Sequence, residues 1–343
     1  MTVTRNGDWG FQDYTPLTTL IERTDNALEA LGLFEEIYGT STTAEVERIT
    51  EGSGDILAKE RNGERNYAGD ESARKEYFQI PFYPYDKLTK ANDVQDFREY
   101  GTADTPASVE MRVEKNLVRI GKDHEKLKRK AMYTCLKGDT FANGYTGTQY
   151  NRNFATVWGV TGDVFTGGID FTNANANPAM YIEKNCREHI TGLAQDDAGS
   201  YVVAALCGSG FFNSLENHPS TQGAFSEYLS VQEPLRNRMA PSNGNAVGRI
   251  FDFKGTVYIE DVSGQIARDD AYVLPIGIAD MFLIQYAPAN TLAHANTVAE
   301  KMYMFLKQDE RVATLETETS FQVICTRPEL ICILNANTLL ADA

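Results

Sequence analysis

The chain has 343 residues, 42% of them hydrophobic, which is enough for two or so folded modules and excludes a disordered protein. No run of about 18 apolar residues predicts a membrane span, and the first residues lack the apolar core of a signal peptide. A net charge of −16 argues against bulk attraction to nucleic acid. The 5 cysteines are scattered and lack metal-ligand spacing, which indicates buried thiols in a reducing cytoplasm.

The first 90 residues predict an arm followed by a long excursion. Residues 1–42 begin irregularly, and an amphipathic helix is expected over 17–31. In residues 44–90, two strand-like runs, around Val46–Thr50 and Tyr77–Phe82, flank about 20 polar, glycine-rich residues. A loop of that length inside a compact domain usually has a function or is disordered. It cannot bury much of itself, so we expect it to lie on another chain.

A short helix is expected over 91–100, and a much longer one follows it. Thr105 and Pro106 predict its start and Gly138 its end. Roughly 32 residues give a rod of about 48 Å, longer than a compact domain needs. One narrow apolar stripe predicts a strut on a sheet or a neighbour, and it consists of Val113, Leu117, Ile120, His124, Leu127, Ala131 and Cys135.

The strut is basic although the chain is acidic. Residues 106–137 hold nine Lys and Arg against four Asp and Glu, so they carry +5 and the rest of the chain −21. These bases either pair with an acidic surface of a neighbouring copy or form a solvated helix face, and the second interpretation is favoured.

The remainder predicts a mixed α/β region. Residues 140–144 and 153–158 indicate a hairpin, and the Gly- and Asn-rich residues 162–177 a linker. A helix over 178–193, a strand over 201–206 and a helix over 210–217 follow, then strands over 256–262, 272–276 and 281–286. The last strands, 321–325 and 330–334, are expected to pair with 154–158, which would make the middle region an insertion.

No segment carries a recognisable catalytic or metal-binding motif. His124-Glu125 begins like a zinc motif, but Lys128 stands where the second ligand is needed. The turn 207–210, Cys-Gly-Ser-Gly, lacks the spacing of a nucleophile elbow or a phosphate loop and favours a strand-to-helix turn. His218 is expected to end the following helix. Asp196-Asp197 and Asp269-Asp270 lack metal-ligand spacing. The sequence predicts no catalytic residue, metal or cofactor.

The order of several segments resembles the lambda-type major capsid proteins of tailed bacteriophages, the capsid protein E family. The segments that carry the resemblance over most of the chain are Asn92–Thr102, Leu136–Gly138, Ala205–Leu215, Asn217–Pro219, Leu274–Gly277, Tyr286–Ala289 and Ile324–Leu330.

The resemblance implies an α+β Hong Kong 97-type capsid fold. Its parts would be an N-terminal arm (1–43), an E-loop (44–90), a P-domain (91–165) with spine helix 106–137, an A-domain (166–308) and a C-terminal return to the P-domain (309–343). It implies a structural protein, not an enzyme, that self-assembles as hexamers and pentamers into an icosahedral head around double-stranded DNA. Assembly in the bacterial host cytoplasm is expected, and no membrane partner.

Several finer expectations follow from the same resemblance. The E-loop would supply assembly contacts through Gly52, Gly54, Lys59, Arg61, Gly63, Arg65 and Gly69. No Lys–Asn isopeptide bond is expected from Lys59, Asn62 or Asn66. The arm is too short to contain a scaffolding segment, so a separate scaffolding protein is implied, with a portal protein and, as an open possibility, a decoration protein. The alternatives are an encapsulin-like compartment and an enzyme that uses the 200–215 turn.

Overall fold

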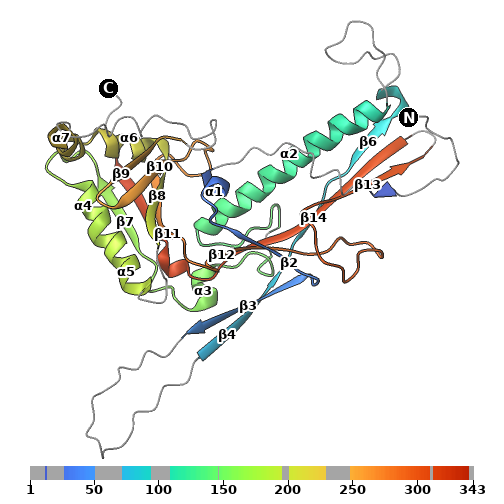
Figure 1. Ribbon diagram of the computed structural model, residues 1–343, viewed down its shortest axis with the longest axis horizontal. Coiled ribbons are helices and arrows are strands. Elements are labelled where there is room, and N and C mark those ends of the chain that lie inside the picture. The colour runs from blue at the N-terminus through green and yellow to red at the C-terminus, as the bar shows by residue number, and fades with distance from the viewer. Residues whose placement is uncertain are drawn as a thin grey trace, which may run out of the picture.

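The computed structural model describes residues 12–13, 27–50, 72–93, 109–145, 147–194, 201–228, 248–309 and 312–339. The start of the expected spine helix, most of the expected helices over 17–31 and 91–100, and the tip of the excursion lie outside these residues. Within them, the chain forms two sheets, a separate hairpin and one long helix (Figure 1).

The first sheet has seven strands in the order β1-β13-β14-β12-β2, and β5 and β6 also pair with β14. Its strands are β1 (Gln12–Asp13), β2 (Glu35–Tyr38), β5 (Phe82–Pro84), β6 (Lys87–Lys90), β12 (Phe282–Tyr286), β13 (Tyr303–Gln308) and β14 (Val312–Cys325). The helix α1 (Ala27–Ala30) precedes β2, and the 3-10 turn η2 (Ala91–Asp93) follows β6. Every pairing but that of β2 with β12 is antiparallel.

The long helix α2 (Val109–Leu136) lies along the first sheet, beside β14, and confirms the expected spine within the described residues. It runs through Gly121 without interruption and ends at Gly138, whose φ of 92° is left-handed as expected of a C-cap. The predicted stripe is buried at Leu117, Ile120, His124, Ala131 and Cys135. Leu117 and Ile120 pack with Met302, Met304 and Leu315 of the sheet.

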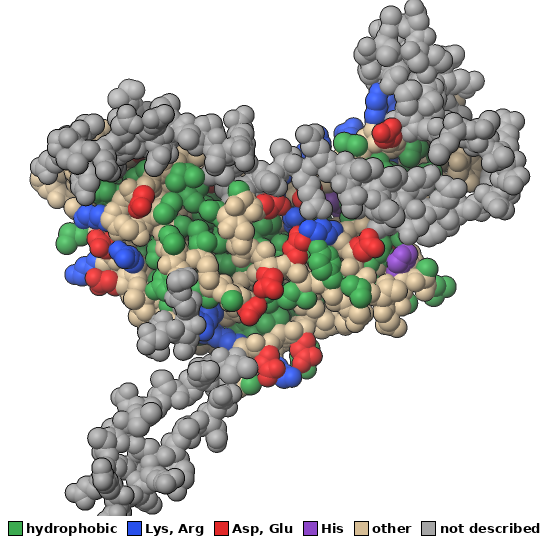
Figure 2. Space-filling model, viewed as in Figure 1, with side chains coloured by type: hydrophobic (Ala, Val, Ile, Leu, Met, Phe, Trp, Pro, Cys, Tyr) green, Lys and Arg blue, Asp and Glu red, His purple; other side chains and the backbone are tan. Residues whose placement is uncertain are grey.

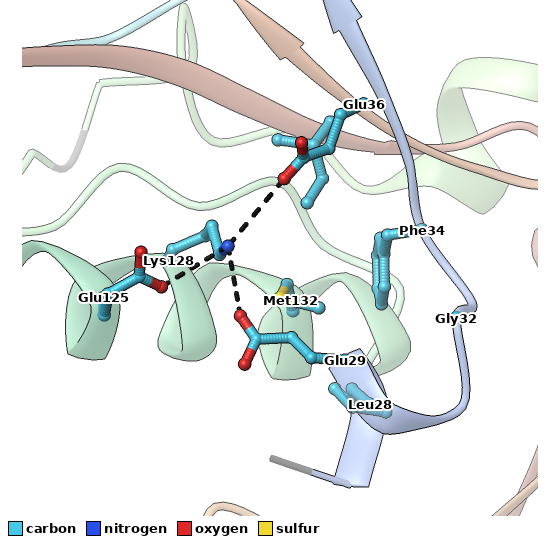
Figure 3. Close-up of a pocket in the computed structure, with 9 residues that line it drawn as sticks. Leu28, Glu29, Gly32, Phe34, Glu36, Glu125, Lys128 and Met132 are labelled. Atoms are coloured by element: carbon cyan, nitrogen blue, oxygen red, sulfur yellow. Dashed lines mark ion pairs between the residues drawn. The ribbon is translucent and has the colours of Figure 1, made fainter. Parts of the chain in front are cut away.

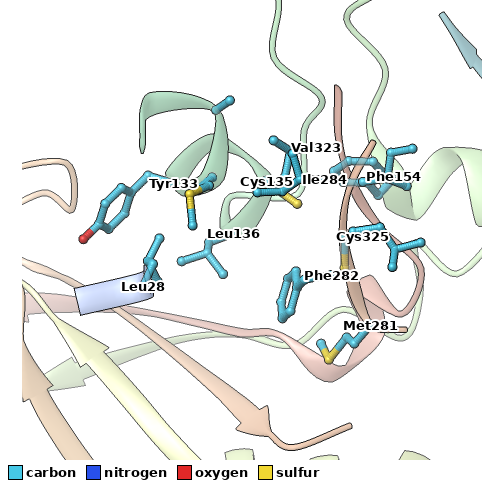
Figure 4. Packing of buried hydrophobic residues seen from close by; sticks show 14 of the residues in the cluster. Leu28, Tyr133, Cys135, Leu136, Phe154, Met281, Phe282, Ile284, Val323 and Cys325 are labelled. Atoms are coloured by element: carbon cyan, nitrogen blue, oxygen red, sulfur yellow. The ribbon is translucent and has the colours of Figure 1, made fainter. Parts of the chain in front are cut away.

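The largest core cluster lies where the C-terminal turns of α2 meet β12 and β14 (Figure 4). Tyr133, Cys135 and Leu136 come from the helix, and Phe282 and Val323 come from the two strands. Leu28 of α1 joins the same cluster, so the N-terminal arm is packed against the spine helix.

The second sheet has six strands in the order β7-β15-β11-β8-β10-β9. Its strands are β7 (Thr166–Asp170), β8 (Val202–Cys207), β9 (Ile250–Phe253), β10 (Thr256–Glu260), β11 (Asp270–Ile276) and β15 (Cys332–Thr338). The helices of this region are α4 (Pro178–Ile182), a π-helical segment (Glu183–Arg187), α5 (Glu188–Ala194), α6 (Ser209–Asn217) and α7 (Pro219–Tyr228).

The central strand β8 explains why this region contains a buried sheet. Val203, Ala205 and Cys207 face a core shared with α4, α5 and α6, whereas Ala204 and Leu206 face the core under α2. A strand buried on both faces is a continuous apolar run and not an alternating one. The predicted strand over 201–206 and the helices over 178–193 and 210–217 are therefore confirmed, and the helix α6 ends at His218 as expected.

Three expectations for residues 140–177 are wrong. Residues 154–158 form a short helix, α3 (Phe154–Trp158), because Asn153 caps its start and Gly159, with φ of 75°, ends it. The expected hairpin is reduced to a single bridge between Asp139 and Asn153. The expected linker 162–177 contains β7, whose Gly167 and Gly168 fit where a Cβ would meet neighbouring side chains.

The last strand also pairs differently from the prediction. β15 joins the second sheet between β7 and β11, and it does not return to residues 154–158. The connection from β14 to β15 contains the turn η5 (Pro328–Leu330), close to the predicted turn at Arg327-Pro328. One continuous stretch of chain therefore links the two sheets. The domain boundaries stay a prediction.

Candidate assembly interface

Within the predicted excursion 44–90, β3 (Thr43–Thr50) and β4 (Ser72–Gln79) form a two-stranded hairpin that extends away from both sheets (Figure 1). The expectation is wrong for its last residues, because β5 and β6 pair with β14 of the first sheet. The strands pair with each other and with no other strand among the described residues. One face is apolar near the body, where Ala44, Val46 and Phe78 are buried. Acidic and basic side chains gather on its exposed surface (Figure 2), where Lys75 lies 3.1 Å from Glu45.

An ion pair fixes β3 to the connection between the sheets. Arg48 Nη2 lies 2.6 Å from Glu329 Oε1, and Arg48 Nη1 donates to the Thr326 carbonyl at 3.3 Å. Both partners lie between β14 and β15, and Glu329 is buried. Leaving either charge of such a buried pair without its partner is costly, so the pair fixes the orientation of β3 as well as stabilising its attachment.

The opposite strand, β4, is fixed by two further arginines. Arg152 Nη2 lies 2.8 Å from Glu76, and its guanidinium lies 5.1 Å from the centroid of the Phe78 ring. Arg74 donates to the Trp158 carbonyl at 3.2 Å. Burial raises the pKa of Glu76, but hydrogen bonds from Arg152 and Arg74 outweigh it and leave that pKa below its ordinary value. Glu76 is therefore held as an anion between two cations.

An aromatic cluster completes the base of the hairpin. The Phe78 ring lies 6.1 Å from that of Phe154 and 6.3 Å from that of Trp158, both in α3. Trp158 Nε1 donates to the Cys325 carbonyl at the end of β14, 2.9 Å away. The short helix that the sequence prediction missed is thus the platform on which the hairpin rests. The base of the hairpin is therefore held in a fixed position on the body of the molecule.

The candidate contact residues of the excursion, Gly52, Gly54, Lys59, Arg61, Gly63, Arg65 and Gly69, lie outside the described residues. The anchoring residues were not predicted, although the pattern contains a signal for them. Arg48 shares its face with Ala44 and Val46, and Arg74 stands directly opposite Arg48 in the register. Charged residues on the apolar face of a strand indicate buried partners elsewhere.

A second charged cluster joins the N-terminal arm to α2 around a small pocket (Figure 3). Lys128 Nζ lies 3.1 Å from Glu29 of α1, 3.4 Å from Glu125 and 3.9 Å from Glu36 of β2. Only 12% of the Lys128 side chain is exposed. Burial lowers the pKa of Lys128, but the charges of Glu125 and Glu29 outweigh it and raise that pKa above its ordinary value.

The same cluster contains two more cations. Arg129 lies 3.9 Å from Glu29, and Lys301 forms an ion pair with Glu36. Burial raises the pKa of Glu36, but the hydrogen bonds from Lys301 and Tyr38 outweigh it and leave that pKa below its ordinary value. Part of the positive charge of the spine helix is therefore neutralised by acids of the same chain, and not by a neighbouring copy or by solvent alone.

The 207–210 turn is built for packing. Cys207 ends β8, α6 begins at Ser209, and a Cβ on Gly208 would lie 2.0 Å from the Ala267 carbonyl oxygen. Burial raises the pKa of the Cys207 thiol, which disfavours the nucleophilic thiolate. His218 is buried and bonds to Ser220 and to the Asn173 carbonyl. The geometry offers no activated nucleophile at this turn.

His124 is a buried residue of the spine helix, as the stripe predicts. Its Nε2 lies 3.0 Å from Thr317 Oγ1, and the Thr317 hydroxyl donates to the Tyr85 carbonyl. Because that hydroxyl has one proton, His124 Nε2 is the donor of the pair. Burial lowers the pKa of His124 to about 4, against the opposing charges of Asp123 and Glu125.

Within the described part of the chain, no three His, Cys, Asp or Glu side chains are grouped so that they could hold a metal ion. The helices in those same ranges include none with the length and apolar character needed to cross a bilayer.

An extended hairpin, a long helix lying on a sheet and a second sheet with its own helices define a class of fold that known structures share. The chain is similar to a subunit of the cyanophage Pam1 capsid, with a TM-score of 0.54, 12% identity and 98% of each chain covered. It is also similar to the capsid of Ralstonia phage GP4, with a TM-score of 0.53, 10% identity, and coverage of 94% of this chain and 93% of that one. The fold is that of the Hong Kong 97-type capsid subunits.

Sequence comparison gives the family. The model of the phage major capsid protein E family matches residues 14–336, so the chain belongs to that family. It is 28% identical to the major capsid protein of Pseudomonas phage KPP10, over 93% of this chain and 95% of that protein. It is 23% identical to the major capsid protein of Salmonella phage Felix O1, over 95% of each.

Proposed function

We propose that copies of this chain associate as hexamers and pentamers around phage double-stranded DNA, with the β3–β4 hairpin of each copy lying on a neighbour. Membership of the family makes the chain a major capsid protein, the subunit of the icosahedral head shell of a tailed phage. The sequence relatives are phage major capsid proteins, which favours the head shell over an encapsulin-like compartment.

The observation that supports the hairpin contact is that the hairpin extends away from both sheets while its base is held rigidly. Arg48–Glu329, Arg152–Glu76 and the Phe78 cluster hold its base, while both of its outer edges lack a partner strand among the described residues. Unpaired edges bind other chains readily. A rigidly held edge does so with little loss of conformational entropy.

Shell formation follows from repeating such contacts with symmetry. A hairpin that binds a different surface of the next copy makes a heterologous contact. A series of such contacts forms a closed assembly when the successive rotations between copies return to the first copy. Each copy engages several neighbours, so contacts that are weak singly become strong together.

The finer partners are part of the same proposal. A separate scaffolding protein guides assembly in the host cytoplasm, a portal protein occupies one vertex, and a decoration protein is an optional addition. The chain has no catalytic role. This is supported by the buried Cys207 and by the structural nature of the family.

Electron microscopy of the purified protein, with and without the scaffolding protein, tests the proposal. Uniform closed particles are expected, and a persistent small oligomer would refute it. Replacing residues 52–71 by a short Gly-Ser turn should leave a folded, soluble protein that forms no shells, because the hairpin base is retained and its reach is lost. Exchange of the exposed Lys184 for Ala provides a control that should assemble normally. Normal particles from the shortened hairpin would contradict its assigned role.

A further inference from the structure

The outer surface of α2 carries a continuous row of basic side chains, here called the basic row. At about 100° per residue, its members fall within a sector of about 80°, on the side of the helix away from the buried stripe. They are Arg112, Lys115, Arg119, Lys122, Lys126 and Lys130. The buried stripe contacts β13 and β14 through Leu117 and Ile120, so the basic row faces away from the sheet.

The basic row contains no acid of its own. Asp123 borders the sector and lies 3.6 Å from Lys126, whose side chain is nevertheless 70% exposed. Glu125 is directed instead to Lys128. In the described ranges, Arg119, Lys122 and Lys130 are exposed and form no ion pair. These three residues therefore differ from Lys128 and Arg129 on the same helix, whose charges are neutralised by acids of the arm.

The spacing of the row makes it a local region of positive potential. Successive bases are three or four residues apart, about 4.5–6 Å along the axis, and the whole row extends about 27 Å. These separations are shorter than the Debye length of about 8 Å at physiological salt, so the charges add. Outside residues 106–137 the chain carries a net charge of −21, which is spread over the rest of the molecule and is largely screened at such distances.

We infer that the basic row is the surface on which the enclosed double-stranded DNA lies, held through its phosphates and without sequence preference. This inference rests on the proposed function, because it requires DNA inside the shell. The row would extend along about eight base pairs, at 3.4 Å per pair. Contacts of exposed lysines with phosphates are weakened by salt and permit sliding, as packaging and ejection require.

A second copy of the chain fits the row less well than DNA does. Some of the carboxylates that could pair with a row of bases are already paired within the chain, among them Glu29, Glu36, Glu76, Glu260 and Glu329. The phosphate backbone instead presents an uninterrupted series of anions. Charge complementarity therefore favours nucleic acid, with an acidic protein as the competing occupant that a test must separate.

Lysine acetylation of whole particles separates these occupants. Lys122, Lys126 and Lys130 should be labelled at least several-fold less in DNA-filled heads than in heads emptied of DNA, as read by mass spectrometry. Lys184 and Lys254, exposed on the other sheet's region, are the internal controls and should be labelled equally in both. Equal labelling of the row in filled and emptied heads, or protection in both, would overturn the inference. So would protection found only in precursor shells that hold a scaffolding protein. Each of these results would leave shell formation itself intact.

The isolated subunit gives an independent measurement. Binding of a fluorescent short DNA duplex at low salt should weaken several-fold in the variant Lys122→Glu with Lys130→Glu. The salt slope should fall by about one for each lysine removed. The matched variant Lys184→Glu with Lys254→Glu makes the same change in net charge and should retain most of the binding. Equal loss in both variants would overturn the assignment to the basic row.

Discussion

Replacing Lys128 by Met should destabilise the subunit, because it removes the cation that three carboxylates share. Glu29, Glu36 and Glu125 all lie within 4 Å of Lys128 Nζ, and the lysine side chain is only 12% exposed. Methionine fills a similar volume, so the change isolates the charge. The N-terminal arm, which supplies Glu29 and Glu36, should be the part that loosens first.

The size of the stability loss depends on which partners the three carboxylates keep after Lys128 is removed. Removing one partner of a buried ion pair costs about 3–5 kcal/mol. Here Glu36 keeps Lys301 and Glu29 keeps Arg129, although the Arg129 pair is long at 3.9 Å. Glu125 loses its pairing with Lys128 but is partly exposed. We therefore expect a loss at the low end of that range, about 3 kcal/mol.

Urea unfolding of the purified subunit, followed by circular dichroism, measures this loss. The matched control is Lys126→Met on the same helix, whose side chain is 70% exposed and forms an ion pair with Asp123, and it should change stability by less than about 0.5 kcal/mol.

The pH dependence supplies a sharper criterion. The pKa of Glu36 is lowered in the folded state, so its contribution is present above pH 4.5 and is lost as the pH falls through the lowered pKa. Lys128 contributes to this lowering after Lys301 and Tyr38, so the part of the stability difference between the wild-type chain and Lys128→Met that comes from Glu36 should shrink below about pH 4.5. Equal effects of Lys128→Met and Lys126→Met at pH 7, or a difference that grows on acidification, would refute the reasoning.

Three further predictions concern buried side chains. The unfolded state binds a proton at His124 near pH 6.5, but the folded state does so only near pH 4. The free energy of unfolding should therefore decrease by about 3 kcal/mol as the pH falls from about 6.5 to about 4. Urea unfolding at several pH values should show that His124→Gln lacks this component. Phe78→Ala should cost about 3–5 kcal/mol in the same assay, whereas the exposed neighbour Tyr77→Ala should cost less than about 0.5 kcal/mol. Cys207→Ala should cost about 1–2 kcal/mol and leave shell formation normal by electron microscopy.

Each of these has a clear contradicting result. An unchanged pH slope in His124→Gln would show that the imidazole is not held neutral by burial. Equal losses in the free energy of unfolding for Tyr77→Ala and Phe78→Ala would show that the aromatic cluster does not anchor the hairpin. Loss of shells, or rapid thiol labelling of the folded protein, would contradict a packed Cys207.

The parts of the fold that could be predicted are the elements whose periodic pattern of apolar residues continues over many residues. The stripe of α2 repeats over many turns, and its end at Gly138 has a conformational cause, so local signals and tertiary packing agree there. The strand β3 was likewise predicted from the alternation at Val46–Thr50, whereas the run predicted over Tyr77–Phe82 overlaps only the end of β4 and the start of β5. Family membership, which the resemblance of ordered segments implied, is confirmed by the match over residues 14–336.

Short elements and distant pairings could not be predicted in the same way. The helix α3 has five residues, too few to show a period, and only its caps at Asn153 and Gly159 distinguish it from a strand. β7 contains Gly167 and Gly168, which suggest a loop, and its strand conformation depends on pairing with β15. That pairing joins segments far apart in the sequence and has no local signal.

The position of Glu329 has a mechanical consequence for the whole subunit. It lies on the short connection between β14 of one sheet and β15 of the other, and Arg48 of the hairpin is attached to it. The hairpin and the two sheets are thus attached to the same short connection between β14 and β15. A change in the angle between the sheets would move the base of the hairpin with it. If the hairpin lies on a neighbouring copy, as proposed above, that change would also shift the surface with which it contacts the neighbour.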